Sequence, residues 1–229
     1  MEHLVVLTGA GMSEESGLKT FRDQGGLWEN YDVMEVASYE GWAKNKTLVL
    51  QFYNERRRQL KNAKPNSGHT RLAELEKFFK VDIITQNVDN LHEMAGSKNV
   101  LHLHGELTKV RSTKDPGYVK DIGYSDVHVG DLCPKGGQLR PDVVWFGEAV
   151  PAMDEAIEIT TRADIFVVIG TSLNVYPAAG LINYAPAKAK IFLIDPKPIN
   201  AQVYREFEFI CEKAGKGVEI LSNKLLNKG

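Results

Sequence analysis

Short apolar runs recur along the chain, and they constrain its fold more than any other feature. The runs are rich in β-branched residues, which suits strands buried on both faces of a parallel sheet. Residues 70–79 and 153–161 lie between such runs and place apolar side chains three or four positions apart, as helices do. This alternation predicts an α/β fold with a doubly wound parallel sheet. The runs span residues 4–8, 81–85, 100–103, 143–146, 165–169 and 191–194.

Two stretches interrupt this alternation. Residues 28–62 have a helical pattern that carries Trp42, Phe52 and Tyr53, whereas residues 106–140 are polar and rich in glycine, with few clear elements. We interpret both as insertions that form one smaller module beside the sheet. The predicted sheet domain therefore comprises residues 1–27, 63–105 and 141–229.

Charge and cysteine content exclude several classes of protein. The formal net charge of −2 gives no general attraction to nucleic acid or to anionic membranes. Cys133 and Cys211 form no CxxC pair, which excludes a secreted disulfide scaffold. No apolar run approaches the roughly 20 residues of a membrane span, and the N-terminus lacks the pattern of a signal peptide. We therefore expect a cytoplasmic protein.

A glycine-rich turn, Thr8-Gly9-Ala10-Gly11-Met12-Ser13, follows the first apolar run. Glycines let the backbone turn tightly and approach a pyrophosphate, although a plain strand–helix turn has the same pattern. Dehydrogenases also need a third glycine, where this chain has Glu14, and an acidic residue about 20 positions on, after a second strand. Glu29 is near that distance but follows Gly-Gly-Leu-Trp, which is not a strand pattern. The turn therefore disfavours a hydride-transfer enzyme.

Five segments, in order along the chain, resemble the signatures of the sirtuin (Sir2-type) family of NAD-dependent protein deacylases. The segments are GAGMSEESGLKTFRD at 9–23, QNVDNLH at 86–92, HLHGE at 102–106, RPDVVWFGE at 140–148 and GTS at 170–172. The resemblance implies a Rossmann-like NAD-binding domain with a smaller inserted module.

The resemblance also implies NAD as the cofactor. In sirtuins the acyl-lysine oxygen attacks C1′ of the nicotinamide ribose as nicotinamide leaves. Asp89 would accept hydrogen bonds from the carboxamide, Asn87 would orient ribose or water, and Phe21 with Arg22 would shield the reacting carbon. The implied cofactor residues are Gly9, Ala10, Gly11, Ser13, Thr20, Phe21, Arg22, Gln86, Asn87, Asp89, Gly170, Thr171, Ser172, Asp195 and Ala214.

A general base must remove a proton from a ribose hydroxyl, and histidine suits this task because its ordinary pKa lies near working pH. The resemblance assigns the role to His104, immediately before Gly105, and includes Asn87 and Asp89 in the catalytic set. Two residues apart on a strand, His102 would point the same way, and we interpret it as a hydrogen-bonded structural residue. His69 is interpreted as structural, and the role of His92 stays open.

Two segments resemble the edges between which sirtuins bind an extended acyl-lysine peptide. They are the predicted strand over 144–148, with Val144, Phe146, Gly147 and Glu148, and the segment 173–176, with Val175. Main-chain pairing would supply most of the affinity, so sequence selectivity should be low. The expected partners are acylated proteins, with no nucleic acid or membrane.

The structural zinc site of typical sirtuins is missing. Ser112 and Asp115 keep the spacing of the first CxxC pair without its thiolates, and the second pair has only Cys133. One cysteine cannot make a tetrahedral thiolate site. A mixed site of His128, Asp131 and Cys133 is an alternative, but loop polarity explains these residues equally well. We therefore expect no zinc.

The acyl-group preference is predicted from Tyr53 and Arg56. On a helix residues three apart share a face, where a hydroxyl and a guanidinium can jointly bind a carboxylate. The Y-x-x-R pair resembles the signature of the sirtuin branch that removes succinyl and malonyl groups. A solvated basic helix face is the alternative, because Arg57 and Arg58 follow directly.

The leading hypothesis is therefore an NAD-dependent lysine deacylase that acts on succinyl, malonyl and also acetyl groups. Alternatives within the enzyme class are a plain deacetylase and a mono-ADP-ribosyltransferase. A non-catalytic NAD or ADP-ribose sensor is the alternative outside it, but a sensor has no need of a base such as His104.

Overall fold

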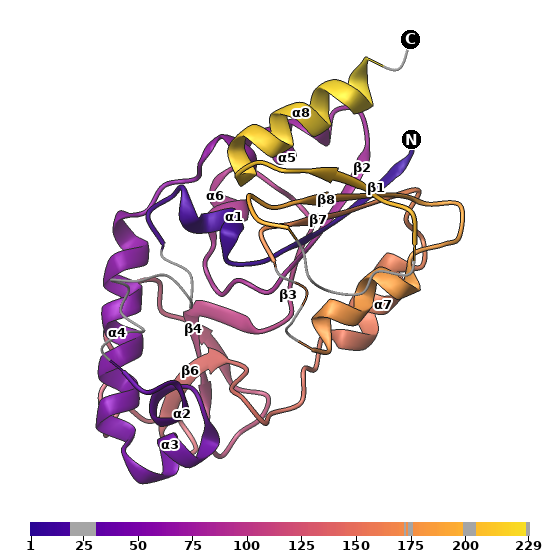
Figure 1. The fold of residues 1–229 in the computed structure, drawn as a ribbon. Coiled ribbons are helices and arrows are strands. Elements are labelled where there is room, and N and C mark those ends of the chain that lie inside the picture. The colour runs from indigo at the N-terminus through magenta and orange to yellow at the C-terminus, as the bar shows by residue number, and fades with distance from the viewer. Residues whose placement is uncertain (19–30, 172, 174–175, 199–204, 228–229) are drawn as a thin grey trace.

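A computed structural model describes residues 1–18, 31–171, 173, 176–198 and 205–227. Its larger sheet has six parallel strands in the order β3-β2-β1-β7-β8-β9 (Figure 1). Five of the predicted runs correspond to strands of this sheet. The strands are β1 His3–Thr8, β2 Lys80–Thr85, β3 Val100–His102, β7 Ile165–Ile169, β8 Lys190–Ile194 and β9 Glu208–Ile210.

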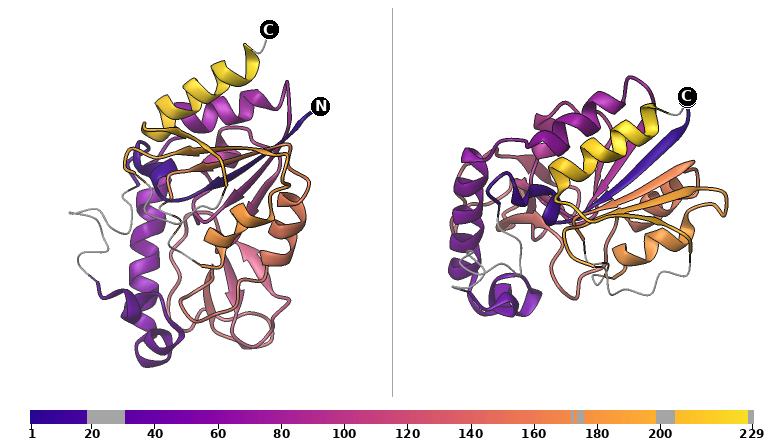
Figure 2. Two further views of the ribbon diagram at one scale, coloured as in Figure 1. Left: turned by 45° about the vertical axis from the view of Figure 1, so that its right-hand side comes forward. Right: turned by 45° about the horizontal axis from the view of Figure 1, so that its top comes forward.

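Both faces of the large sheet are buried, as the apolar runs predicted. Leu4 and Val6 of β1 face a core shared with α5 (Ser67–Leu75) and α8 (Ala214–Leu226), while Val5 and Leu7 face the opposite core. The helix α7 (Met153–Thr160) and the 3-10 helix η2 (Ala178–Tyr184) cover that second face. Figures 1 and 2 show α5 and α8 side by side on one face, with α7 on the other. The doubly wound α/β prediction is confirmed.

The sheet changes its direction of winding between β1 and β7. From β1 the chain continues outward to β2 and β3, whereas β7 leads to β8 and β9 on the other side. In open parallel sheets, ligands bind outside the carboxyl ends of the strands at such a switch point. The short helix α1 (Gly11–Glu14) follows β1 there, and α6 (Leu91–Met94) follows β2.

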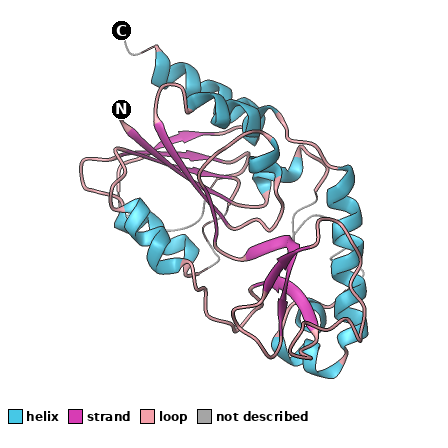
Figure 3. Cartoon of the chain, turned by 180° about the vertical axis from the view of Figure 1, so that it is seen from behind, coloured by secondary structure: helices cyan, strands magenta, loops and turns pink. Residues whose placement is uncertain are grey.

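A smaller module lies beside this sheet (Figure 3). Residues 106–140, expected to hold few elements, contribute to a three-stranded antiparallel sheet of β4 Gly105–Ser112, β5 Val119–Asp121 and β6 Leu139–Val143. The helices α2 (Val33–Val36), α3 (Tyr39–Lys44) and α4 (Lys46–Asn62) share a third core with it. β4 and β6 each cross a predicted boundary by a residue or more, and the division into domains stays a prediction.

The predicted strand at 143–146, and the predicted strand over 144–148 with it, are wrong. β6 ends at Val143 and pairs antiparallel with β4, and only an isolated bridge joins Phe146 to Ser38. The apolar run is buried all the same, because Trp145 packs in the core of the small module against Trp42. Periodicity registers that the run is buried but not which core receives it.

Hydrogen bonds join the two turns at the positions of the missing zinc ligands. Ser112 Oγ lies 3.1 Å from Cys133 Sγ and accepts from the backbone N–H groups of Lys114 and Asp115. Cys133 Sγ accepts from Gly137 N, and Asp115 forms an ion pair with Lys135 at 2.9 Å. Within the described residues, no group of three or more His, Cys, Asp or Glu side chains is placed to hold a metal ion.

No helix in the described part of the chain combines the length and the apolar character needed to cross a membrane.

Candidate active site

The glycine turn and the Gly170–Thr171 turn meet at the carboxyl ends of β1 and β7. Gly9 N donates to Ile169 O and Gly11 N donates to Gly170 O, both at 2.9 Å. A Cβ on Gly11 would lie 2.7 Å from Gly170 Cα, closer than real Cβ contacts. The glycines are therefore needed for close contact between the two turns. The spacing of the glycines in the sequence does not show that a second turn packs against them.

Ser13 connects the glycine turn to the QNVD segment after β2. Its buried hydroxyl donates to Asp89 Oδ2 at 2.9 Å and accepts from Asn87 Nδ2 at 3.1 Å. Asn87 Nδ2 also donates to Gly9 O at 3.0 Å. The structure thus brings together four residues that the sequence placed in one site.

Asp89 is a buried carboxylate at the centre of this arrangement. Burial raises its pKa, against which act hydrogen bonds from Ser13 and from Leu91 N and the positive charges of His102 and Arg56. A carboxylate held by two donors and two nearby cations is a fixed acceptor suited to an amide N–H.

His104 lies in the turn between β3 and β4 rather than on a strand with His102. Its Nδ1 is 3.0 Å from Gln86 O, and because a carbonyl only accepts, Nδ1 carries the proton. Burial lowers the pKa of this half-buried imidazole, only partly opposed by the Gln86 bond. Nε2 therefore keeps its lone pair near neutral pH, as a general base requires.

His102 is engaged on both ring nitrogens. Nδ1 lies 3.0 Å from Asn87 O, and Nε2 lies 2.7 Å from the Glu93 carboxylate. The interpretation of His102 as a hydrogen-bonded residue agrees with this geometry. Glu93 was missed in the sequence, since nothing local marks its pairing with a residue nine positions on.

His69 and His92 form a buried pair with ring centroids 4.8 Å apart, and His92 Nε2 lies 3.2 Å from Thr8 Oγ1 at the end of β1. His69 Nδ1 accepts from Asn66 N in a capping box at the start of α5, which fits a structural role. Burial lowers the pKa of His69 to about 4. Both rings are therefore neutral at working pH, since burial also lowers the pKa of His92.

The remaining described cofactor residues lie at neighbouring strand ends. Gln86 Nε2 donates to Thr171 Oγ1 at 3.3 Å, Asp195 follows β8, and Ala214 begins α8. Burial raises the pKa of Asp195, and Lys197 N donates to its Oδ1. Ala10 and Gly170 lie in the two turns. The predicted contacts Thr20, Phe21, Arg22, Ser172 and Val175 lie outside the described residues.

These residues fit a dinucleotide. Two turns, which glycines allow to pack closely, lie at the switch point of the sheet. Amide, hydroxyl and carboxylate groups line the adjoining strand ends. Such a set of groups suits a pyrophosphate, two ribose diols and a carboxamide.

The segment after β6 is anchored beside His104. Val144 N donates to His104 O at 2.9 Å, and Phe146 N donates to Ala37 O at 2.9 Å. Glu148 accepts from Arg140 through both oxygens, at 2.7 and 3.0 Å, and from Trp145 N. The Glu148 side chain therefore fixes the turn through Gly147, while Phe146 stays 51% exposed.

Tyr53 and Arg56 lie on one face of α4, as predicted. Tyr53 is buried, and its hydroxyl accepts from Trp145 Nε1 at 3.0 Å. Arg56 is half-buried, and burial lowers the pKa of its guanidinium, against which act Tyr53 and Asp89. The carboxylate of Asp89, in the QNVD segment, therefore acts electrostatically on the Arg56 guanidinium.

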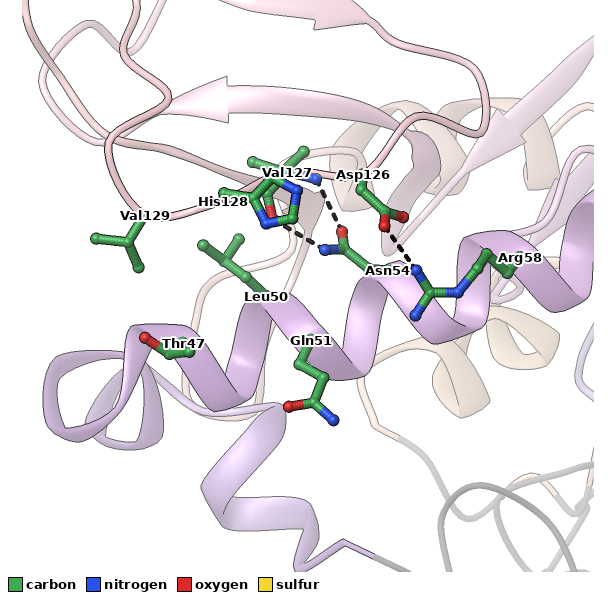
Figure 4. Close-up of a pocket in the computed structure, with 9 residues that line it drawn as sticks. All are labelled: Thr47, Leu50, Gln51, Asn54, Arg58, Asp126, Val127, His128 and Val129. Atoms are coloured by element: carbon green, nitrogen blue, oxygen red, sulfur yellow. Dashed lines mark hydrogen bonds and ion pairs between the residues drawn. The ribbon is translucent and has the colours of Figure 1, made fainter.

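The alternative of a solvated basic helix face does not hold at Arg57. Arg57 is 0% exposed, donates to Leu107 O and Asn54 Oδ1, and has its pKa lowered to about 10 by burial. It joins α4 to β4. Arg58 is the exposed member of the run and pairs with Asp126 at 2.6 Å (Figure 4).

We expect Arg57→Ala to lower the free energy of unfolding by about 2–4 kcal/mol, because it empties a large buried volume and removes the hydrogen bonds to Leu107 O and Asn54 Oδ1. Arg58→Ala is the control on the exposed face and should cost about 0.5 kcal/mol or less. Urea denaturation of the two variants measures the difference. Equal effects would contradict the buried role of Arg57.

The Sir2 family model matches residues 9–177. The chain is similar to proteins named NAD-dependent protein deacylase from Bacteroides thetaiotaomicron, at 55% identity over 99% of both chains, and Helicobacter pylori, at 55% identity over 99% of this chain and 98% of the relative. It is also similar to a crystal structure of a Sir2 homologue in complex with NAD, with a TM-score of 0.87 and 40% identity over 98% of this chain and 89% of the other.

The order of the motifs agrees with the match of the family model over most of the chain. The groups at the switch point between β1 and β7, which suit a dinucleotide, agree with it too. The resemblance to sirtuins is thereby confirmed, and the chain belongs to the Sir2 family.

Proposed function

We propose that this protein removes succinyl and malonyl groups, and also acetyl groups, from lysine side chains of proteins, using NAD and releasing nicotinamide and O-acyl-ADP-ribose. NAD-dependent protein deacylation is the activity of the family to which the chain belongs. The acyl preference and the roles of individual residues are the finer part of the proposal.

NAD supplies an electrophilic ribose carbon when it is bound. The protein must then orient the reactants and accept a proton. His104 performs the second task through Nε2, because Gln86 O holds the proton on Nδ1. Asn87 and Asp89 perform the first, since Ser13 and Gly9 fix their side chains at the strand ends. A base prepared in this way supports an enzyme rather than a sensor.

The substrate is proposed to be an extended acyl-lysine peptide that lies along residues 144–148. The bond from Val144 N to His104 O ties this segment to the base. Phe146 is exposed next to it and offers an apolar surface to the peptide. Because the main chain of the peptide would carry the recognition, many acylated proteins qualify as partners.

The acidic-acyl preference rests on one observation, a half-buried Arg56 that shares a face of α4 with the buried Tyr53 and is acted on electrostatically by Asp89. A desolvated guanidinium that meets a neutral acetyl group gains nothing, whereas a succinyl or malonyl carboxylate can pair with it. A second candidate follows from the same observation. Arg56 could instead serve only as a counter-ion of Asp89, which would give a plain deacetylase.

The experiment compares kcat/KM for one lysine peptide carrying succinyl or acetyl. We expect the wild type to prefer succinyl and Arg56→Met to lower the succinyl-to-acetyl ratio by about 10-fold, the worth of one charged hydrogen-bonded pair. Tyr53→Phe should lower the ratio less. Release of nicotinamide should match deacylated peptide, with no reaction when NAD is omitted.

Arg58→Met is the matched control, because Arg58 lies two residues from Arg56 on the exposed side of α4. Its ratio should equal that of the wild type. A wild type that prefers acetyl would refute the preference. If Arg56→Met slows both substrates equally, Arg56 is the counter-ion of Asp89 and the second candidate holds.

A further inference from the structure

The two histidines around the β3–β4 turn hold two consecutive carbonyls. His104 Nδ1 donates to Gln86 O and His102 Nδ1 donates to Asn87 O, each at 3.0 Å. They differ at the other nitrogen. His104 Nε2 has no hydrogen-bond partner among the described residues, whereas His102 Nε2 lies 2.7 Å from Glu93 Oε1.

The partners of His102 determine its protonation. A carbonyl oxygen and a carboxylate oxygen only accept, so both ring nitrogens must donate, and the ring is an imidazolium. Burial lowers the pKa of His102, but the bond and charge of Glu93, the Asn87 carbonyl and the charge of Glu106 together raise it. His102 and Glu93 therefore form an ion pair near neutral pH.

The His102 ring bonds to Asn87, whose backbone and side chain make several further hydrogen bonds. Asn87 N donates to Thr85 Oγ1 at 3.0 Å, and Asn87 Nδ2 donates to Gly9 O and Ser13 Oγ. His102 supplies the remaining backbone contact, at Asn87 O. Through Ser13 the same network reaches Asp89 Oδ2. A shift of the Asn87 carbonyl would therefore change the orientation of the Asn87 and Asp89 side chains.

We propose that His102, protonated between Glu93 and the Asn87 carbonyl, is a positioning residue of the deacylase reaction that holds Asn87 and Asp89 in register with His104. The inference rests on the proposed deacylase function but not on the acyl preference, because it concerns the cofactor side of the site.

The charge of His102 has a second consequence, at Asp89. His102 interacts electrostatically with Glu93 and His92 of α6, with Glu106 of β4 and with Asp89. Burial raises the pKa of Asp89, and the positive charge of His102 lowers it. Loss of that charge therefore raises the pKa of Asp89 further, so Asp89 becomes protonated at higher pH.

The test uses three substitutions that separate geometry from charge. His102→Ala removes both and should lower kcat by roughly 10-fold, below the 100-fold that a 1 Å displacement of a reacting group can cost. His102→Asn places an amide N–H near the position of Nδ1 and should recover most of kcat. Glu93→Gln keeps the ring but removes its counter-ion. For His102→Ala and His102→Asn, the acidic limb of the kcat/KM profile should move to higher pH.

His3 offers a matched control. It also has acceptors on both nitrogens, Arg162 O at 3.1 Å and Asp82 Oδ2 at 2.6 Å, but it lies at the amino end of β1, away from the site. His3→Ala should lower the melting temperature and leave kcat unchanged. The KM for the peptide should stay near the wild-type value in the His102 variants, because the peptide is proposed to bind along residues 144–148.

Nitrogen-15 NMR of the cofactor-free protein gives a readout independent of turnover. The His102 ring should show two protonated nitrogens at neutral pH in the wild type, and one in Glu93→Gln. The proposal is overturned if His102 is neutral in the wild type. It is also overturned if His102→Ala lowers only the melting temperature, as His3→Ala does. The loss of kcat in His102→Ala should be the same with acetyl and succinyl peptides. The test of His102 therefore does not depend on whether the enzyme prefers acidic acyl groups. A wild type inactive on every acyl peptide would refute the deacylase function instead, whatever the ring protonation.

Discussion

Replacing His104 with alanine is expected to lower kcat by about 10²–10⁴-fold while NAD still binds, because loss of a general base commonly costs that much. The imidazole is prepared for the task, with its proton held on Nδ1 by Gln86 O and its pKa lowered by burial. Steady-state kinetics measure the loss, and calorimetric titration with NAD measures binding.

The sign of the pH dependence follows from the same environment. A base must be neutral to accept a proton, and burial lowers the pKa of His104, so its active form persists to lower pH than that of a solvated histidine. The His104→Ala variant should lack the part of the acidic limb that His104 contributes. His102→Ala serves for comparison and should keep far more activity. If His102 proved to be the more important residue for turnover, the assignment of the base would be wrong.

Gly105→Ala is expected to reduce activity by about 10²-fold or more and to destabilise the fold. Gly105 has φ +78°, and a Cβ there would lie 2.0 Å from Asp142 O. The positive φ alone costs an alanine about 1–2 kcal/mol. The contact with a backbone oxygen forces β4 away from β6, which moves the adjoining His104 from its place, and a displacement of about 1 Å can cost 100-fold.

Gly123→Ala separates these two contributions. Gly123 also has a positive φ, +56°, but an added Cβ would meet nothing within 4 Å. It should therefore show the conformational cost with full activity per folded molecule. Thermal denaturation and kcat of both variants make the comparison. Similar behaviour of the two variants would mean that the contact with Asp142 is relieved without moving His104.

Much of the large domain could be predicted from the sequence. Its strands are buried on both faces, so each one is a continuous apolar run that stands out without reference to any neighbour. The motif residues of the site could be placed for a related reason. Parallel strands end at one edge of the sheet, so the residues after β1, β2 and β7 had to come together there.

The small module shows where this reasoning stops. Its strands are short and half-polar, so residues 106–140 carried no clear periodicity, although they contribute to three strands. The run at 143–146 has the pattern of a strand of the large sheet, because burial in one core and burial in another give the same pattern. Arg57 looked solvated because a row of arginines usually is, yet it fills the interior between α4 and β4.

The sequence by itself determined the α/β class, the order of the motifs and the residue types available for chemistry, because these depend on local pattern and on parallel strand ends. Only the tertiary structure decided what each group is. His102 Nε2 lies against the Glu93 carboxylate, His104 Nδ1 donates to Gln86 O and so leaves Nε2 as the unprotonated nitrogen, and Arg56 is half-buried while Arg57 is fully buried. Protonation and orientation depend on partners distant along the chain, and no local pattern records those partners.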